Sequence, residues 1–253
     1  MNPLLEIRQI GRVLKIALNR PEKRNALNAA MCAELVRVIE HAETDPHVGA
    51  ILLAANGKAF CAGMDLAEIE PGESENLNRL HEQLFTLGAR LVKPIVGAIH
   101  GASLGGGMGL VANCHVAIAA ESATFGLTEV RLGLWPLLVF RAVSSAIGER
   151  RAVSLALTGW IFRAAEAREM GLVQEICDDV ESRAMEVANE IAAWSPASIR
   201  SGLAFVHQIR GMSAEEAAEA ARRVRTEIFE SADFREGIAA FREKRPPKWP
   251  SLG

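Results

Sequence analysis

Apolar residues cluster in two short segments near the start of the chain, 5–10 and 13–18, with a glycine between them. This arrangement predicts a β-hairpin. Apolar residues then recur at intervals of three or four over residues 27–42, which predicts an amphipathic helix. Asn25 and Asn28 stand at its start, and either side chain is suited to cap the first turn.

Two uninterrupted apolar runs follow, at 48–55 and 95–99, and a third short strand is expected at 115–120. Strands without polar alternation are typical of parallel sheets that are covered on both faces. Helical patterns separate the runs, namely a leucine stripe over 77–91 and a small-residue segment at 108–113. The succession predicts a layered α/β fold with parallel strand pairing.

The pattern changes in the second half of the chain. Beyond Ser144 it is almost wholly helical, and only residues 172–176 look extended. We place a boundary near residues 194–196, between an α/β core of residues 1–195 and a helical segment of residues 196–253. We expect the helical segment to find too few partners in its own chain and to pack on a neighbouring subunit.

Composition excludes several classes of protein. The 253 residues are 49% apolar with a net charge of −3, which argues against disorder and against a general field for nucleic acid. No apolar run approaches the roughly 20 residues of a membrane helix, and we expect no signal peptide. The four cysteines form no CxxC pair and the six histidines no HExxH or HxxxH. We therefore expect free thiols, a cytoplasmic location and no metal site.

Common catalytic motifs fit the chain poorly. The glycines at 105–107 are not followed by the Lys-Ser/Thr of a phosphate-binding loop, and a dinucleotide pattern fits only with its first glycine too far from the strand. Residues 101–105 match GxSxG, which makes Ser103 a candidate nucleophile, although only His207 lies far enough downstream to serve as its base. Cys61 is a further thiol to weigh, but no histidine stands near it in sequence.

Two glycine-containing turns are more informative. Residues 59–66 and 101–107 each follow a buried strand and precede a helical pattern. Unpaired N–H groups at such turns point outward, and two of them converging on one point make an oxyanion hole. The alternative is that the glycines only permit tight turns and close packing.

The two turns and their flanking motifs together resemble the crotonase (enoyl-CoA hydratase/isomerase) superfamily. The matching stretches run in order over nearly the whole chain. They are 19–21, 25–28, 59–66, 93–94 with 105–107, 125–129 with 132–133, 157–159, 164–167, 171–173 and 241–245.

The resemblance implies a crotonase-like spiral of ββα units with a C-terminal helical trimerisation segment, assembled as a homotrimer or a dimer of trimers. It implies that the backbone N–H groups of Met64 and Gly106 hold the thioester oxygen of an acyl-CoA and stabilise an enolate. No separate cofactor is implied, since coenzyme A is part of the substrate. The CoA contacts that carry over are Arg24, Ala26, Leu27, Ala62, Asp65, Leu66, Gly105, Phe241 and Lys244, the last two lent by a neighbouring subunit.

A local cationic patch for the CoA phosphates is expected from basic side chains. The candidates are Arg20, Lys23, Arg24, Lys58 and Lys244. Ala67 stands where some hydratases of the family have a lysine, so one phosphate contact is in doubt.

The chain keeps one of the two glutamates that the hydratases use. Glu129 matches the second, whereas Gly109 occupies the position of the first. We expect burial among apolar neighbours to raise the pKa of Glu129. Because one base suffices to shift a double bond, isomerisation of an enoyl-CoA is the leading hypothesis and hydration the second.

Thioester hydrolysis and simple binding are also compatible with the sequence. Glu129 followed by residues 133–136 resembles the hydroxyisobutyryl-CoA hydrolases, which have an acid where this chain has Leu137. A non-catalytic acyl-CoA-binding scaffold is the rival from another class. Trp135, Leu137 and Leu138 either shape the acyl pocket or pack under the following helix.

Overall fold

The computed structural model describes residues 3–68 and 74–252, and its main sheet has six strands in the order β1-β2-β3-β4-β6-β9. β1 and β2 form the predicted hairpin, and every later pairing in this sheet is parallel. The strands are β1 (Leu5–Ile10), β2 (Val13–Leu18), β3 (Ala50–Ala55), β4 (Ile95–Ile99), β6 (Val116–Ala119) and β9 (Glu175–Ile176). Parallel strands with both faces covered explain the runs without polar alternation.

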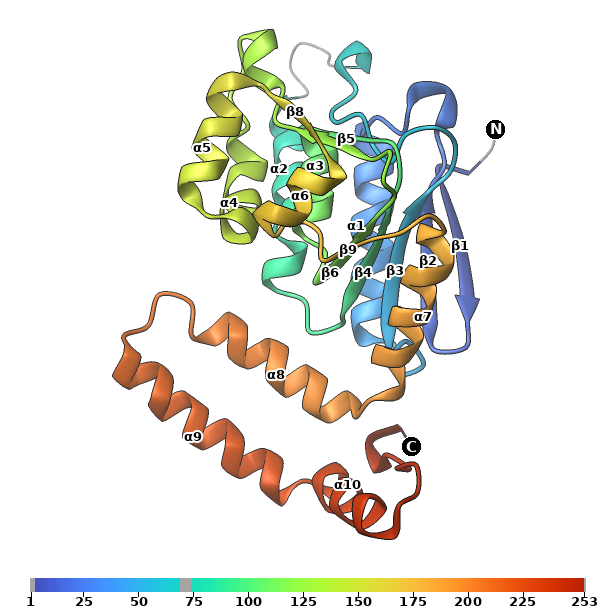
Figure 1. Cartoon of the computed structure of the whole chain (residues 1–253), viewed down its shortest axis with the longest axis vertical. Helices are drawn as coiled ribbons and strands as arrows, with labels where there is room; N and C mark the ends of the chain where they lie inside the picture. Colours follow the sequence, from blue (N-terminus) through green and yellow to red (C-terminus); the bar gives the residue numbers. More distant parts are fainter. Residues whose placement is uncertain (1–2, 69–73, 253) are drawn as a thin grey trace.

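Helices cover both faces of this sheet (Figure 1). On one face, apolar side chains of α1 (Ala29–Thr44) join the larger hydrophobic core. On the other face, a smaller cluster combines alternate strand residues with the alanines of α7 (Val180–Ala193). Asn28 caps α1 by accepting from the N–H of Met31 at 2.9 Å.

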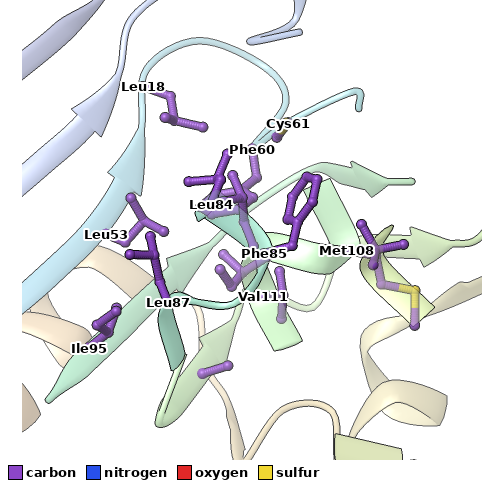
Figure 2. Packing of buried hydrophobic residues seen from close by; sticks show 14 of the residues in the cluster. Leu18, Leu53, Phe60, Cys61, Leu84, Phe85, Leu87, Ile95, Met108 and Val111 are labelled. Carbon is purple, nitrogen blue, oxygen red and sulfur yellow. The ribbon is translucent and has the colours of Figure 1, made fainter. Parts of the chain in front are cut away.

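The leucine stripe forms a shorter helix than predicted. α2 covers Ser74–Phe85, and a 3₁₀ turn at Leu87–Ala89 follows it, so Leu91 lies outside the helix. Figure 2 shows Leu84 and Leu87 packed beside Leu53 of β3 and Ile95 of β4. The stripe therefore faces the core, as the spacing predicts.

A second sheet, which was not predicted from the sequence, contributes Phe125 and Phe162 to the larger hydrophobic core. It has three strands in the order β5-β7-β8, of three residues each: β5 (Ala102–Leu104), β7 (Thr124–Gly126) and β8 (Ile161–Arg163). The helices that accompany it are α3 (Gly106–Ala112), α4 (Leu137–Ile147), α5 (Glu149–Thr158) and α6 (Ala164–Met170).

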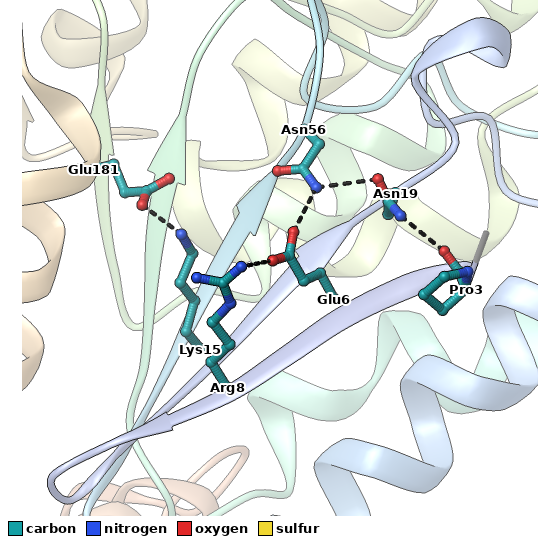
Figure 3. Close-up of polar contacts among 7 residues, drawn as sticks. All are labelled: Pro3, Glu6, Arg8, Lys15, Asn19, Asn56 and Glu181. Atoms are coloured by element: carbon teal, nitrogen blue, oxygen red, sulfur yellow. Dashed lines mark hydrogen bonds and ion pairs between the residues drawn. The ribbon is translucent and has the colours of Figure 1, made fainter.

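Polar side chains fasten the edge of the main sheet (Figure 3). The side-chain amide of Asn56 donates to Glu6 and to Asn19, each at 3.0 Å, and Asn19 donates to the carbonyl of Pro3 at 2.9 Å. Lys15 forms an ion pair with Glu181 at the start of α7. These contacts tie β1, β2 and the segment after β3 together.

Three helices end the chain: α8 (Pro196–Gln208), α9 (Ala214–Glu230) and α10 (Ala232–Glu243). They extend away from the sheets (Figure 1). The hydroxyl of Ser195 donates to Asp233 at 2.5 Å, which ties the start of this tail to α10. α7 ends at Ala193, close to the boundary expected from sequence, although a separate unit at 196–253 stays a prediction. No helix within 3–68 or 74–252 is long and apolar enough to cross a membrane.

Candidate active site

The two glycine-containing turns lie against each other. Cys61 forms a parallel bridge with Ser103 of β5. The N–H of Cys61 donates to the carbonyl of Ala102, and the N–H of Leu104 donates to the carbonyl of Cys61, both at 3.0 Å. Turns that are far apart in sequence are therefore joined by backbone hydrogen bonds.

Leu27 fixes the orientation of Met64. The N–H of Leu27 donates to the carbonyl of Gly63 at 2.7 Å, and the N–H of Asp65 donates to the carbonyl of Leu27 at 2.9 Å. In a parallel bridge of this kind, the N–H of the residue between the two bonded groups points to the opposite side. The N–H of Met64 is thereby turned away from Leu27.

The N–H of Gly106 belongs to the first residue of α3, where no intrahelical acceptor exists. Gly63 and Gly106 lie in close contact, since a Cβ added to Gly63 would stand 3.4 Å from the nitrogen of Gly106. Gly63 has a φ of +94°, which favours glycine, and that added Cβ would also stand 2.8 Å from the carbonyl oxygen of Leu104. Both turns therefore need small residues at this contact.

Glu129 stands beside the same contact. It begins a 3₁₀ turn at Glu129–Leu132, and its Oε1 would lie 3.0 Å from a Cβ added to Gly105. Its Oε2 is buried and has no hydrogen-bond partner among the described residues. Burial raises the pKa of this carboxyl above its ordinary value, as expected from the sequence.

A cavity of about 250 Å³ joins these groups. Apolar side chains from the 27–66 region, α2 and the 132–139 segment form most of its wall. Its polar side chains are Asn78, His81, Thr128 and Glu129. The remaining lining residues are Leu27, Ala62, Gly63, Met64, Leu66, Phe85, Gly105, Gly106, Leu132, Leu134, Trp135, Pro136, Leu137, Leu138 and Val139. The bulky residues 135, 137 and 138 thus shape the pocket.

His81 is one of several cavity residues, with Asn78, Phe85 and Val139, that were not singled out from the sequence. It lies on α2 and is only 5% exposed, and its Nε2 has no hydrogen-bond partner within the described part of the chain. Burial lowers the pKa of its imidazole. The leucine stripe marked the core-facing side of α2, but nothing in the sequence signalled that this side also reaches the cavity.

The position of the absent glutamate is occupied by apolar atoms. A Cβ added to Gly109 would stand 2.5 Å from Cγ1 of Val139 and 3.0 Å from Cδ1 of Phe85. A side chain at position 109 would therefore displace two cavity walls.

The structure favours packing roles for the two nucleophile candidates, as the poor fit of the catalytic motifs to the sequence indicates. Ser103 is fully buried inside β5 and does not line the cavity, so the serine-elbow interpretation is wrong. Cys61 is also fully buried, and burial raises the pKa of its thiol to about 12, which disfavours the reactive thiolate. Both residues serve packing between the two turns.

The basic residues divide into two groups. Lys23, Arg24 and Lys58 are exposed. Arg20 is buried and forms an ion pair with Asp65 at 3.0 Å, and it also donates to the carbonyl of Ala26 at 2.7 Å. The expectation that Arg20 contributes to a cationic patch is therefore wrong, because its charge is already paired.

The other expected contact residues are only partly brought together. Leu27, Ala62, Leu66 and Gly105 line the cavity. Ala26 is buried next to Leu27, and the carboxylate of Asp65 faces Arg20. Phe241 and Lys244 lie at the end of α10, at the opposite end of the molecule from the first turns of α2 and α3 (Figure 1).

Known proteins are similar to this chain in sequence and in fold. The profile of the family described as Enoyl-CoA hydratase/isomerase matches residues 8–251. This chain belongs to that family. A 2,3-dehydroadipyl-CoA hydratase of Escherichia coli is 33% identical over 252 residues, covering 98% of each chain. A mevalonyl-coenzyme A hydratase of Aspergillus fumigatus is 34% identical over 250 residues, covering 94% of this chain and 91% of the relative.

Solved structures of the family agree with the fold. An enoyl-CoA hydratase of Mycobacterium smegmatis superposes with a TM-score of 0.93 at 31% identity, covering 98% of this chain and 99% of that structure. One from Bacillus anthracis also has a TM-score of 0.93, at 29% identity. The crotonase-like α/β fold expected from the sequence is confirmed.

Proposed function

We propose that this family member acts on the double bond of an enoyl-CoA through a thioester enolate. The N–H groups of Met64 and Gly106 bind the thioester oxygen, and Glu129 exchanges a proton with the carbon next to the thioester carbonyl. The observation that carries the proposal is the contact of the Glu129 carboxylate with Gly105, immediately before the free N–H of Gly106 and in the cavity that Met64 also lines. A raised pKa suits a carboxyl that must both give and take a proton.

Two reactions of an enoyl-CoA, isomerisation and hydration, proceed through such an enolate. For isomerisation, Glu129 takes a proton from one carbon and returns it to another, and no second polar group is needed. Hydration also needs a base for water. The single carboxylate among the described residues that line the cavity favours isomerisation, and the names of the relatives favour hydration.

The CoA portion is proposed to lie across the turns that hold the oxyanion. Exposed Arg24 and Lys58 offer charge for the phosphates, and Leu27, Ala62 and Leu66 offer apolar contact. Phe241 and Lys244 reach a site only from a neighbouring subunit, which is consistent with a proposed homotrimer or dimer of trimers. Phe241 is 83% exposed in the single chain.

Replacing Glu129 by glutamine tests the proposal. We expect Glu129→Gln to reduce turnover of 2-enoyl-CoA and 3-enoyl-CoA by about 10²-fold or more, because an amide cannot exchange the proton. Binding of CoA, measured by calorimetry, should persist.

Glu121→Gln is the matched control, since Glu121 is exposed and outside the cavity. Unchanged turnover in Glu129→Gln would reject the assigned base. Binding of both thioesters by the unaltered protein, with no isomerisation, hydration or release of CoA, would favour a scaffold instead.

A further inference from the structure

Among the described residues, two buried side-chain atoms without a hydrogen-bond partner belong to residues that line the same cavity: Nε2 of His81 and Oε2 of Glu129. A buried polar atom without a partner costs about 1–3 kcal/mol, so such atoms are uncommon in a packed interior. One is a carboxylate oxygen on the 3₁₀ turn at 129–132, and the other is an imidazole nitrogen on α2.

The surroundings hold the His81 ring in place. Its ring lies 5.5 Å from that of Phe85, one helical turn further along α2, and its side chain is buried. Phe85 in turn fills the space beside Gly109. His81 therefore lines, from α2, a cavity to which α3 contributes no polar side chain.

Burial pushes the two groups toward complementary protonation states. It lowers the pKa of His81, which favours the neutral ring with a free lone pair, and it raises the pKa of Glu129, which favours the protonated acid. Paired groups whose pKa values are shifted in opposite directions are suited to act as base and acid in one reaction.

We propose that His81 is a second catalytic side chain, the base that activates water for addition to the enoyl-CoA double bond. A water O–H bond breaks and its proton goes to Nε2 of His81, while the water oxygen bonds to the carbon two positions from the thioester carbonyl. The electron pair of the double bond moves into the enolate, and Glu129 gives its proton to the adjacent carbon. The excess proton on His81 then returns to Glu129 through solvent.

This inference rests on the proposed function, because it needs an enoyl-CoA in the cavity, and it assigns hydration rather than isomerisation to the site. The substitution that tests it is His81→Gln, which keeps a polar side chain but cannot take the proton. We expect hydration of 2-enoyl-CoA to fall by about 10²-fold or more.

A partial reaction separates a catalytic role from a structural one. Exchange of the proton next to the carbonyl of a saturated acyl-CoA with deuterium from solvent requires Glu129 and the oxyanion hole but no added water. We expect His81→Gln to retain this exchange within about threefold of the unaltered protein, and Glu129→Gln to lose both exchange and hydration. His41→Gln, on the exposed face of α1, is the matched control and should leave hydration unchanged.

The outcomes are distinct. Unchanged hydration in His81→Gln overturns the role of His81, as does equal loss of hydration and exchange, which would indicate a structural role. If the unaltered protein neither hydrates, isomerises nor exchanges, it is the proposed function that fails.

Discussion

Gly109 is the residue at which this chain departs most from the two-glutamate pattern of the hydratases. The space that a side chain would need is filled by Val139 and Phe85. The departure is therefore a change in packing as well as the absence of a charge. It also involves His81, because the ring of His81 packs against that of Phe85.

We expect Gly109→Glu to destabilise the protein without improving hydration. The added Cβ alone would stand 2.5 Å from Val139, and overpacking of this kind costs about 1–3 kcal/mol. Urea denaturation measures the free energy of unfolding, and the hydration assay measures the activity. A stable and faster Gly109→Glu variant would contradict this account of the cavity.

Several site residues could be predicted from the sequence because they lie in recognisable turns. Met64, Gly106 and Glu129 each belong to a short motif, and the fold brings all three to one cavity. His81 could not be predicted, because its spacing on α2 fits a core-facing position equally well and only the tertiary contacts place this residue in the lining of the cavity. The role of Arg20 was predicted wrongly because sequence does not reveal that Asp65 neutralises it.

At the scale of elements, the site depends on how closely α3 approaches the turn at 59–66. A Cβ added to Gly107 would stand 2.2 Å from the carbonyl oxygen of Cys61. Any side chain there must push α3 away from the turn that carries Met64. The separation of the two N–H groups is thus set by a glycine that does not itself face the substrate.

We expect Gly107→Ala to reduce turnover by about 10²-fold, comparable to losing one oxyanion donor, because the two N–H groups no longer converge. Steady-state kinetics on 2-enoyl-CoA measures the effect. Gly202→Ala in α8 is the control, since nothing lies within 4 Å of its added Cβ, and it should gain about 0.5–1 kcal/mol of stability with turnover unchanged. Full activity in Gly107→Ala would show that the close approach is dispensable.

The elements that sequence predicted well are those with long apolar patterns, such as β3, β4 and α1. The strands of the second sheet have only three residues each, too few for a periodic signal, and they depend on pairing with distant partners. The leucine stripe extended past the end of α2 because Leu87 and Leu91 continue to face the core after the helix has ended.

At the scale of the whole molecule, the half-buried His115 links stability to pH. Desolvation, then His207 and Arg210, lowers the pKa of His115 to about 4, and its neutral Nδ1 accepts from the N–H of Ile95 at 3.0 Å. Between about 4 and the ordinary value of 6.5, the unfolded chain binds more protons than the folded one. Stability from this group is therefore fully present above 6.5 and falls as pH decreases through that window.

We expect His115→Asn to reduce this pH dependence, because an amide oxygen can accept from Ile95 but cannot take a proton. Between about pH 7 and about pH 4.5, the free energy of unfolding should fall by about 2 kcal/mol more in the unaltered protein than in the variant. Urea denaturation at a fixed protein concentration gives both values. Equal decreases in the free energy of unfolding of the two proteins would show that a group other than His115 causes the pH dependence.

Two parts of the cavity wall differ in how they are held in place. Arg20 joins Asp65 and Ala26, and Asn25 donates to the carbonyls of Asn56 and Ala59 at 2.8 Å, so the turn that carries Met64 is held by buried polar groups. The part of the cavity wall at 132–138 consists mostly of exposed apolar side chains. Substitutions there can alter which acyl chain fits without disturbing the chemistry, which leaves this protein free to evolve new substrate preferences on an unchanged catalytic frame.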